Sequence, residues 1–598
     1  MRLVSKTLRR GRRRRGWALL VIITLTACSL MVLASVMNWA NQNAALTARN
    51  NEYFATTYAA EAATEKVLSS MSSQYQNYGF PLLISNMSVY ATNLPTAADG
   101  SCWTNYQFSG GTTANQMIVT NTAMSQTVVE SAPYAGLNLM ANTYELIVNA
   151  QNIHTEYQIV STVGQQVYFG TVPMFQFAIF YQNDMEICPG PAMTIGGAVH
   201  GNANIYLCPG GGLTLLNTIT SVSNIFLQES PLDPVNRKFS FVNFDGSPGQ
   251  LNDVNPLILP VGTNTTGTAG NASQNAYATL GLPQAGQTVT SATGTNLFYN
   301  KADMIVVVSN NNSITVTSGA IVNNRATVIS QSQWQAFLST NGTFYDQRDS
   351  LTVQPVVINV SNLVKWSATN AVLRPVLSSF RGSGAADVQS IYVADLRQKS
   401  STQPGIVLSN GAVLPPQGLS IATPDPAYII GNWNSQLTNN GASDAGLLDT
   451  TYARPSAVYA DAVTILSSAW DPSKSSSSYN TRNATADTVN AALFMGIVPS
   501  NGSSFSGGVE NFLRLLENWN GATFTYNGSM VEMFTSQIAN QPYVEEGPGP
   551  GAYYTAPTRN WAFDNNFTNP AKQPPMTPQI VKVQRSQWVL LPPHATSF

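Results

Sequence analysis

Side chains spaced for catalysis are few in this sequence. Its three histidines lie far apart, at His154, His200 and His594, and no His-Glu-x-x-His or Cys-x-x-Cys pattern occurs. Zinc sites depend on such closely spaced ligands, so we expect no metal site. The phosphate-binding pattern Gly-x-x-x-x-Gly-Lys is also missing, which argues against a motor ATPase. We predict no catalytic residue and no cofactor, and we interpret His200 as a solvated turn residue.

Carboxylates are the remaining candidates, because paired acids hydrolyse glycosidic bonds. Glu510 and Glu517 flank Arg514 within residues 506–519, whose pattern predicts a short amphipathic helix. On that helix Glu510 and Arg514 would form a solvated ion pair one turn apart. Three other acids are expected to fix turns: Asp425, Asp461 and Asp564. Four tryptophans that could stack on sugars are expected in the core: Trp433, Trp470, Trp519 and Trp561. We therefore predict that the chain is not an enzyme.

A repeat of twenty residues places two cysteines in register. Cys188 begins one copy and Cys208 the next, and apolar positions such as Val199 and Ile219 match between the copies. A period of about 20 with short apolar strands and Gly or Asn corners is typical of a parallel β-solenoid. Neighbouring coils lie about 4.8 Å apart, within the range of about 4.4 to 6.8 Å that disulfides span between Cα atoms. Cys188 and Cys208 could thus form a disulfide; the alternative is a pair of reduced structural thiols.

Charge is distributed very unevenly along the chain. Only 10% of the 598 residues are charged, against roughly 25% in an average soluble domain. Eight of the 28 basic residues lie in the first fifteen positions, so 20 basic and 30 acidic residues remain, a balance of −10. An acidic remainder disfavours nucleic acid as a partner.

A long apolar stretch follows the basic leader. Residues 17–39 carry no charge and begin and end with Trp17 and Trp39. About 20 apolar residues suffice to span a bilayer, and tryptophan suits its interfaces. By the positive-inside rule, the leader stays in the cytoplasm and the chain after the apolar stretch lies on the other side of the inner membrane.

The same segment predicts a helix that continues beyond the membrane. No Gly or Pro occurs between Trp17 and Tyr78, and larger or apolar residues recur every seven positions from Leu46 to Val67. Gly79 and Pro81 then supply a stop. We expect one continuous helix of about 60 residues, roughly 90 Å long.

These features together resemble the N-terminal region of PilX-type minor pilins. The shared elements are the basic leader, Gly16 at the cytoplasmic edge, the apolar stretch and an amphipathic helix containing Ala-Ala-Glu-Ala-Ala-Thr-Glu at 59–65. The resemblance implies that a prepilin peptidase cuts after Gly16, that Trp17 is then methylated, and that other pilin subunits bind through the helix. Major pilins usually carry Phe or Met first and Glu fifth after the cut, where this chain has Trp17 and Val21. That departure favours a minor subunit.

A lipoprotein signal overlaps this region as an alternative. Leu25-Thr26-Ala27-Cys28 fits a lipobox, in which the thiol of Cys28 would receive a lipid. Apolar residues continue from Leu30 to Val36, whereas lipoproteins normally turn polar after the cysteine. We favour Cys28 as a small apolar residue within a membrane helix.

We predict an α+β fold, mainly β, in which a long pilin-like helix precedes a β-rich body that contains parallel β-solenoid turns. The expected units are a basic leader (1–16), the transmembrane and amphipathic helix (17–78), a pilin-like α+β unit (79–173), a solenoid-like body with insertions (174–435) and a C-terminal mixed α/β block (436–598). Residues 304–309 and 313–317 are expected to form a hairpin.

The expected function is that of a minor pilin or pseudopilin, a structural subunit at or near the tip of a type IV pilus-like assembly. Its β-rich head would bind a surface glycan or protein ligand. The protein is expected first in the inner membrane, with its body outside the cytoplasm, and then on an extracellular pilus or the cell surface. A membrane-anchored or lipidated surface protein outside any pilus is the alternative, followed by a polysaccharide-active β-solenoid enzyme.

Overall fold

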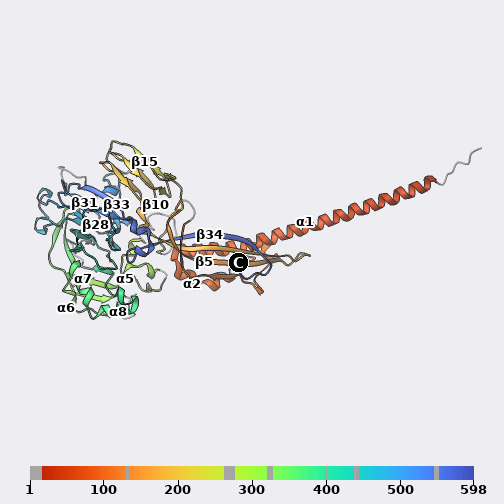
Figure 1. The fold of residues 1–598 in the computed structure, drawn as a ribbon, viewed down its shortest axis with the longest axis horizontal. Helices are drawn as coiled ribbons and strands as arrows, with labels where there is room; N and C mark the ends of the chain where they lie inside the picture. Colours follow the sequence, from red (N-terminus) through yellow and green to blue (C-terminus); the bar gives the residue numbers. More distant parts are fainter. Residues whose placement is uncertain are drawn as a thin grey trace, which may run out of the picture.

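A single long helix projects from a strand-rich body in the computed structural model (Figure 1). The structure describes residues 17–129, 133–261, 276–291, 293–319, 327–397, 401–436, 441, 443–544 and 551–598. The basic leader, including the predicted cleavage residue Gly16, lies outside the described residues. The predicted long helix followed by a strand-rich body is confirmed.

The helix α1 (Trp17–Tyr78) is 62 residues long and unbroken. Its first 35 residues, 17–51, are exposed on every side, and burial begins at Glu52. The chain leaves the helix at Gly79, whose φ of 67° favours glycine, and Pro81 starts the short helix α2 (Phe80–Ser85). A second short helix follows, α3 (Met87–Thr92).

The second half of α1 lies on an antiparallel sheet. Its main strands are β1 (Tyr106–Gly110), β5 (Asn138–Asn152), β6 (Val160–Pro173) and β34 (Gln579–Leu591), and β2 (Thr113–Ala114), β3 (Ile118–Asn121) and β4 (Ser125–Val128) extend it. Tyr75 of α1 packs edge-on against Phe169, with 5.2 Å between ring centroids. The edge strand β34 comes from the end of the chain and runs beside β6 along α1 (Figure 1). The two ends of the described chain therefore build one unit.

Stacked parallel strands build the rest of the body. The largest sheet has, in spatial order, β16 (Gln250–Leu251), β13 (Ile219–Ser221), β10 (Ala198–Gly201), β7 (Phe177–Tyr181), β32 (Met530–Thr535), β29 (Ala492–Ile497), β26 (Ser456–Ala460), β24 (Leu419–Ala422), β22 (Ser390–Asp395), β17 (Met304–Val308) and β18 (Ile314–Ser318). Neighbours are parallel except for β17 and β18, which form the predicted hairpin. The chain enters this stack in its middle at β7, builds one end, returns to the other end and finishes at β32 beside β7.

Four smaller sheets form the other faces of the stack. They comprise β8 (Met185–Ile187), β11 (Ile205–Leu207) and β14 (Ile225–Phe226); β9 (Met193–Ile195), β12 (Leu213–Leu215) and β15 (Val242–Phe244); β19 (Leu338–Ser339), β20 (Phe344–Asp346), β21 (Leu351–Asn359), β23 (Thr402–Ser409), β25 (Ala427–Ile430), β27 (Val463–Leu466) and β30 (Arg514–Leu515); and β28 (Asp487–Asn490), β31 (Thr523–Gly528) and β33 (Thr558–Phe563). Strands of the twenty-residue repeat pair in register, with Val199 opposite Ile219. Their inward aliphatic side chains form the main core.

Helices cover the end of the stack that is remote from the repeat (Figure 1). These are α6 (Gln331–Trp334), α7 (Val360–Thr369) and α8 (Leu373–Arg381), and α5 (Phe298–Lys301) lies nearby. Leu363 and Leu377, from α7 and α8, are buried in the main core. These helices shield apolar side chains that the last turns of the stack would otherwise expose.

Two expectations about the second half of the chain need correction. The unit boundary expected between 435 and 436 does not separate two units. The strand β25 before it pairs in parallel with β27 after it, within one sheet. The helix expected over 506–519 is wrong: this segment contains the 3-10 turn η7 (Val509–Asn511) and the strand β30. Both faces of the segment are buried, so its apolar spacing reflects packing inside the stack rather than one helical face.

Candidate functional site: the exposed helix and its attachment

The exposed half of α1 presents a long row of large apolar side chains. Among the described residues, α1 is the one helix that is long and apolar enough to cross a membrane. Large side chains such as Trp17, Leu30 and Trp39 are more than half exposed. No charged residue occurs from position 17 to Ala48, and Arg49 is the first. Such a surface is stable only when lipid or other apolar protein covers it.

Three hydroxyls in the apolar part of this half are hydrogen-bonded within the helix. The Thr24 hydroxyl donates to the Leu20 carbonyl at 2.9 Å, and Thr26 donates to Ile22 at 2.7 Å. Ser35 donates to Met31 in the same way. Hydroxyls bonded to the preceding turn have no need of water, so these three residues suit the uncharged segment 17–39 to an environment without it.

Polar contacts hold α1 at the point where it enters the body. The buried carboxylate of Glu52 accepts hydrogen bonds from the Thr155 hydroxyl at 2.6 Å and from the Ile159 amide at 2.9 Å. One turn further on, the Thr56 hydroxyl lies 2.8 Å from that of Ser161. These bonds fix the depth and rotation of the helix against the start of β6. Sequence reasoning missed Glu52, because an acid beside Arg49 is also typical of a solvated helix face.

A second contact joins α1 to the C-terminal strand. The guanidinium of Arg585 in β34 binds the carboxylate of Glu65 through two bonds of 2.6 and 2.7 Å. Gln165 donates to the same carboxylate. The hydrogen bond from Arg585 lowers the pKa of Glu65. The pair is largely exposed, so we regard it as a positioning contact of modest energy.

The histidine that the sequence placed on a solvated turn is fully buried, so that expectation is wrong. His200 lies in β10, with Nδ1 2.8 Å from the Thr220 hydroxyl and Nε2 2.9 Å from Oδ1 of Asn202. The rings of Phe180 and Tyr134 pack against it. Burial lowers the pKa of His200 to about 4, so the imidazole is neutral at physiological pH. With both nitrogens engaged by neutral partners, His200 is a structural residue.

The two acids that flank Arg514 in the sequence do not form the solvated contacts that the sequence predicted. Glu510 accepts a hydrogen bond from the Cys188 amide, and Glu517 accepts one from the Ser467 hydroxyl at 2.8 Å. Arg514 instead lies 3.4 Å from the buried carboxylate of Asp349. The solvated Glu510–Arg514 pair is therefore wrong, because the segment is not helical and all three side chains are buried.

The remaining acids hold backbone at corners of the stack. Asp461 accepts hydrogen bonds from the amides of Gln537 and Ala539, and Asp564 from that of Asn566. Trp433 and Trp519 are buried as expected, whereas Trp470 and Trp561 are half-buried. Within the described ranges, no three His, Cys, Asp or Glu side chains gather in a way that could hold a metal ion. The structure brings two of the candidate acids next to each other, because the Asp461 amide donates to the Asp425 carbonyl at 3.2 Å. Glu510, Glu517 and Asp564 each have other partners.

The two repeat cysteines are joined by a disulfide. Cys188 and Cys208 are bonded with 4.5 Å between their Cα atoms, and both are buried beside Phe505. The exposed thiols of Cys28 and Cys102 are unpaired.

We expect the combined Cys188→Ala and Cys208→Ala change to lower the free energy of unfolding by about 3 kcal/mol, because the bond closes a loop of twenty residues in the unfolded chain. Urea unfolding of the full-length chain in detergent would measure this loss. Cys102→Ala is the control and should stay within about 0.5 kcal/mol. Equal stability of the double variant, or recovery of both cysteines as free thiols in peptide mapping, would contradict the bond.

Several buried carboxylates should make the fold more stable in mild acid than in mild base. Burial raises the pKa of Asp425 to about 8 and those of Glu510 and Glu532 to about 7. A raised native pKa means that the folded chain binds the proton more tightly than the unfolded chain does. Stability is then fully present below the unfolded values, near pH 4, and is lost as the pH rises through 7 to 8. We expect a higher midpoint of thermal unfolding at about pH 5 than at about pH 9, and the reverse order would refute the assignment.

No known protein-family profile and no curated protein matches the sequence. Among solved structures, the crystal structure of the competence-associated pilin ComZ from Thermus thermophilus aligns with 90% of this chain and 98% of its own, at 11% sequence identity and a TM-score of 0.27. That TM-score is too low to establish a shared fold. What this chain does must therefore be inferred from its own geometry.

Proposed function

We propose that this chain is a structural subunit of a type IV pilus-like assembly, a minor pilin or pseudopilin of the PilX type. One observation carries the proposal: α1 is exposed on all sides over residues 17–51 and is packed against a four-stranded antiparallel core, β1, β5, β6 and β34, from Glu52 onward. A helix divided in this way can be stored in a membrane and can then assemble with other helices while its body stays outside.

The physical change on assembly is the exchange of lipid for protein around α1. In the inner membrane, acyl chains would cover the uncharged residues 17–39. In a fibre, the corresponding helices of other pilin subunits would cover them, and the internally bonded hydroxyls of Thr24 and Thr26 suit both environments. The Glu52 and Glu65 contacts hold the body at a set position on the helix. Prepilin peptidase is the expected processing partner, with cleavage between Gly16 and Trp17.

The size of the body supports a place at or near the tip. More than 500 residues follow α1, and a unit of this size would crowd its neighbours if it were repeated along a thin fibre. We interpret its stacked parallel strands as β-solenoid turns and assign them a non-enzymatic role in adhesion to a surface glycan or protein. Immunogold labelling of sheared fibres should place the chain at their ends, and even labelling along their length would contradict this position.

Mass spectrometry of the mature N-terminus tests the assignment most directly. We expect the mature chain to begin at Trp17 with a methylated amine. An acylated Cys28 would instead identify a lipoprotein, which requires the first eleven residues of α1 to be removed. An intact Met1 would identify a plain membrane anchor. Either of these two results would overturn the pilin assignment.

A further inference from the structure

Two sheets of the stack stop on either side of a seam. On the largest face, β7 pairs with β32, so the strands continue without a break. On another face the corresponding strands are β9, which comes after β7 and β8, and β33, which comes after β32. There, β9 ends one sheet and β33 ends another, and the two do not pair. The described strands thus leave two sheet edges, those of β9 and β33, beside each other.

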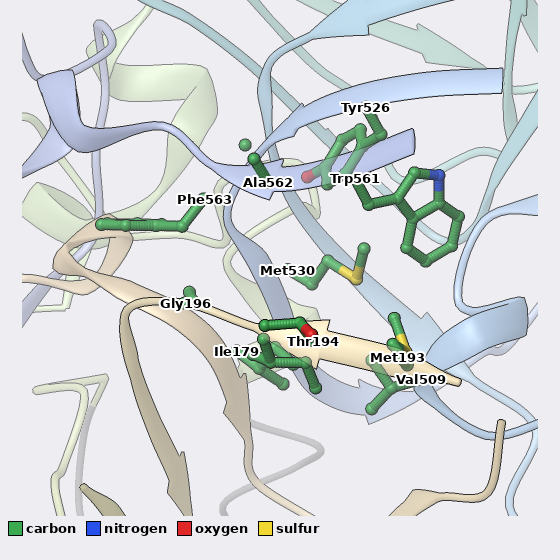
Figure 2. Close-up of a pocket in the computed structure, with 13 residues that line it drawn as sticks. Ile179, Met193, Thr194, Gly196, Val509, Tyr526, Met530, Trp561, Ala562 and Phe563 are labelled. Atoms are coloured by element: carbon green, nitrogen blue, oxygen red, sulfur yellow. The ribbon is translucent and has the colours of Figure 1, made fainter. Parts of the chain in front are cut away.

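An apolar cavity of about 40 Å³ opens between these two edges. Met193 and Thr194 line it from β9, Trp561 and Ala562 line it from β33, and Met530 lies at its back (Figure 2). No charged side chain lines it. A water-sized sphere needs about 10 to 15 Å³, so the cavity has room for about three non-hydrogen atoms, the size of a valine side chain. The ring of Phe563 closes one end of the seam against Gly197.

Backbone groups on both edges are directed into the seam. Met193 donates to the Gly212 carbonyl, and the Ile195 carbonyl accepts from Leu216, so these two residues face β12. Because successive residues of a strand point to opposite sides, the N–H and C=O of Thr194 between them face β33. On β33, Thr558 donates to Ala522.

The same alternation applies along β33. Asp564 donates to the Gly528 carbonyl, so the even-numbered residues of this strand face β31. Trp561 and Phe563 therefore direct their N–H and C=O groups toward β9. In addition, the indole Nε1 of Trp561 is buried and has no hydrogen-bond partner. The seam thus offers backbone donors and acceptors around a small apolar hole.

We propose that this seam is a peptide-binding site that takes an extended segment of a partner protein by strand addition. The segment would lie in the seam between the outer edges of β9 and β33, pair with them and place a small apolar side chain, of about the size of valine, in the cavity. Backbone groups spaced along a strand edge are matched by another strand, whereas a sugar would need several free polar side chains. The lining offers few of these, because the Tyr526 hydroxyl is already bonded to backbone carbonyls. The small volume excludes a lipid chain. The inference does not depend on the pilin assignment.

A phage-displayed library of peptides of roughly seven residues tests the site. The target is the full-length chain in lipid nanodiscs, and Thr194→Pro is the blocking variant, because the proline ring replaces the N–H that faces the seam and costs no hydrogen bond to β12. Thr194→Ala is the matched control, because it keeps that N–H. Binders selected on the unaltered chain should carry alternating small apolar residues. They should bind Thr194→Pro at least about tenfold more weakly and Thr194→Ala within about twofold.

Hydrogen exchange locates the bound peptide. A selected peptide should slow exchange of the amides of Thr194, Trp561 or Phe563, because strand addition uses those groups. The proposal is overturned if the library yields no binder that Thr194→Pro weakens, or if the bound peptide protects amides elsewhere and leaves both edges unchanged. Circular dichroism of the two variants, expected to match the unaltered chain, separates blocking from misfolding.

Discussion

Replacing Ala60 by aspartate is expected to lower the free energy of unfolding by at least about 3 kcal/mol. Ala60 is fully buried where α1 lies on the sheet, next to the buried Ala59 and Ala63. Their small side chains let the helix approach β5 and β6 closely, and the neighbouring core is apolar. A carboxylate at this position would have neither water nor a partner, and the helix would have to move away from the sheet to hydrate it.

The matched control for this change lies two residues further along the same helix. Ala62 is half-buried on another face of α1, so Ala62→Asp carries the same helix-propensity cost without burying a charge. We expect it to lose less than about 1 kcal/mol. Urea unfolding of the full-length chain in detergent, followed by circular dichroism, gives both values. Equal losses for the two variants would show that Ala60 is not at a tight helix–sheet contact.

Replacing Trp433 by alanine is expected to cost about 3 to 5 kcal/mol. Its indole is fully buried and donates to the Ser456 hydroxyl at 2.9 Å. Its backbone amide donates to the Thr488 carbonyl at 2.8 Å and its carbonyl accepts from Asn490. Trp433 thus joins turns of the stack on both sides of position 435. Removing the ring would leave a large cavity there and leave the Ser456 hydroxyl with only its bond to the Leu419 carbonyl.

An exposed tryptophan serves as the control for this substitution. Trp588 in β34 is 45% exposed, so Trp588→Ala should lose no more than about 1 kcal/mol. Urea unfolding of the full-length chain in detergent, followed by circular dichroism, compares the two. If both variants unfold at the same urea concentration as the unaltered chain, the described packing around Trp433 is incorrect.

Local patterns of the sequence were enough to predict several elements. The absence of Gly and Pro from Trp17 to Tyr78, ended by Gly79 and Pro81, predicts the long helix that the structure has. The repeat beginning at Cys188 predicts which positions of neighbouring strands align. These predictions succeed because helix continuity and repeat register depend on residues close in sequence or related by a fixed spacing.

Predictions for isolated polar residues failed for a common reason. His200, Glu510 and Glu517 occur in Gly- and Asn-rich or mixed segments, where a polar side chain usually faces solvent. In the structure each is buried, with partners up to hundreds of positions away, as in the bond from the Cys188 amide to Glu510. Whether a polar group is solvated depends on which strands stack over it. A local sequence pattern does not predict that packing.

The sequence by itself determined the division of this protein into a basic leader, an apolar helix and a large body of sparse charge, because charge and hydropathy are properties of composition. Only the tertiary structure decided how that body is closed. The pairing of β7 with β32 joins segments about 350 positions apart, and β34 returns to complete the sheet under α1. Such pairings depend on how well segments that are far apart in the sequence pack against each other. The same long-range closure leaves the seam between β9 and β33, which no stretch of the sequence predicts.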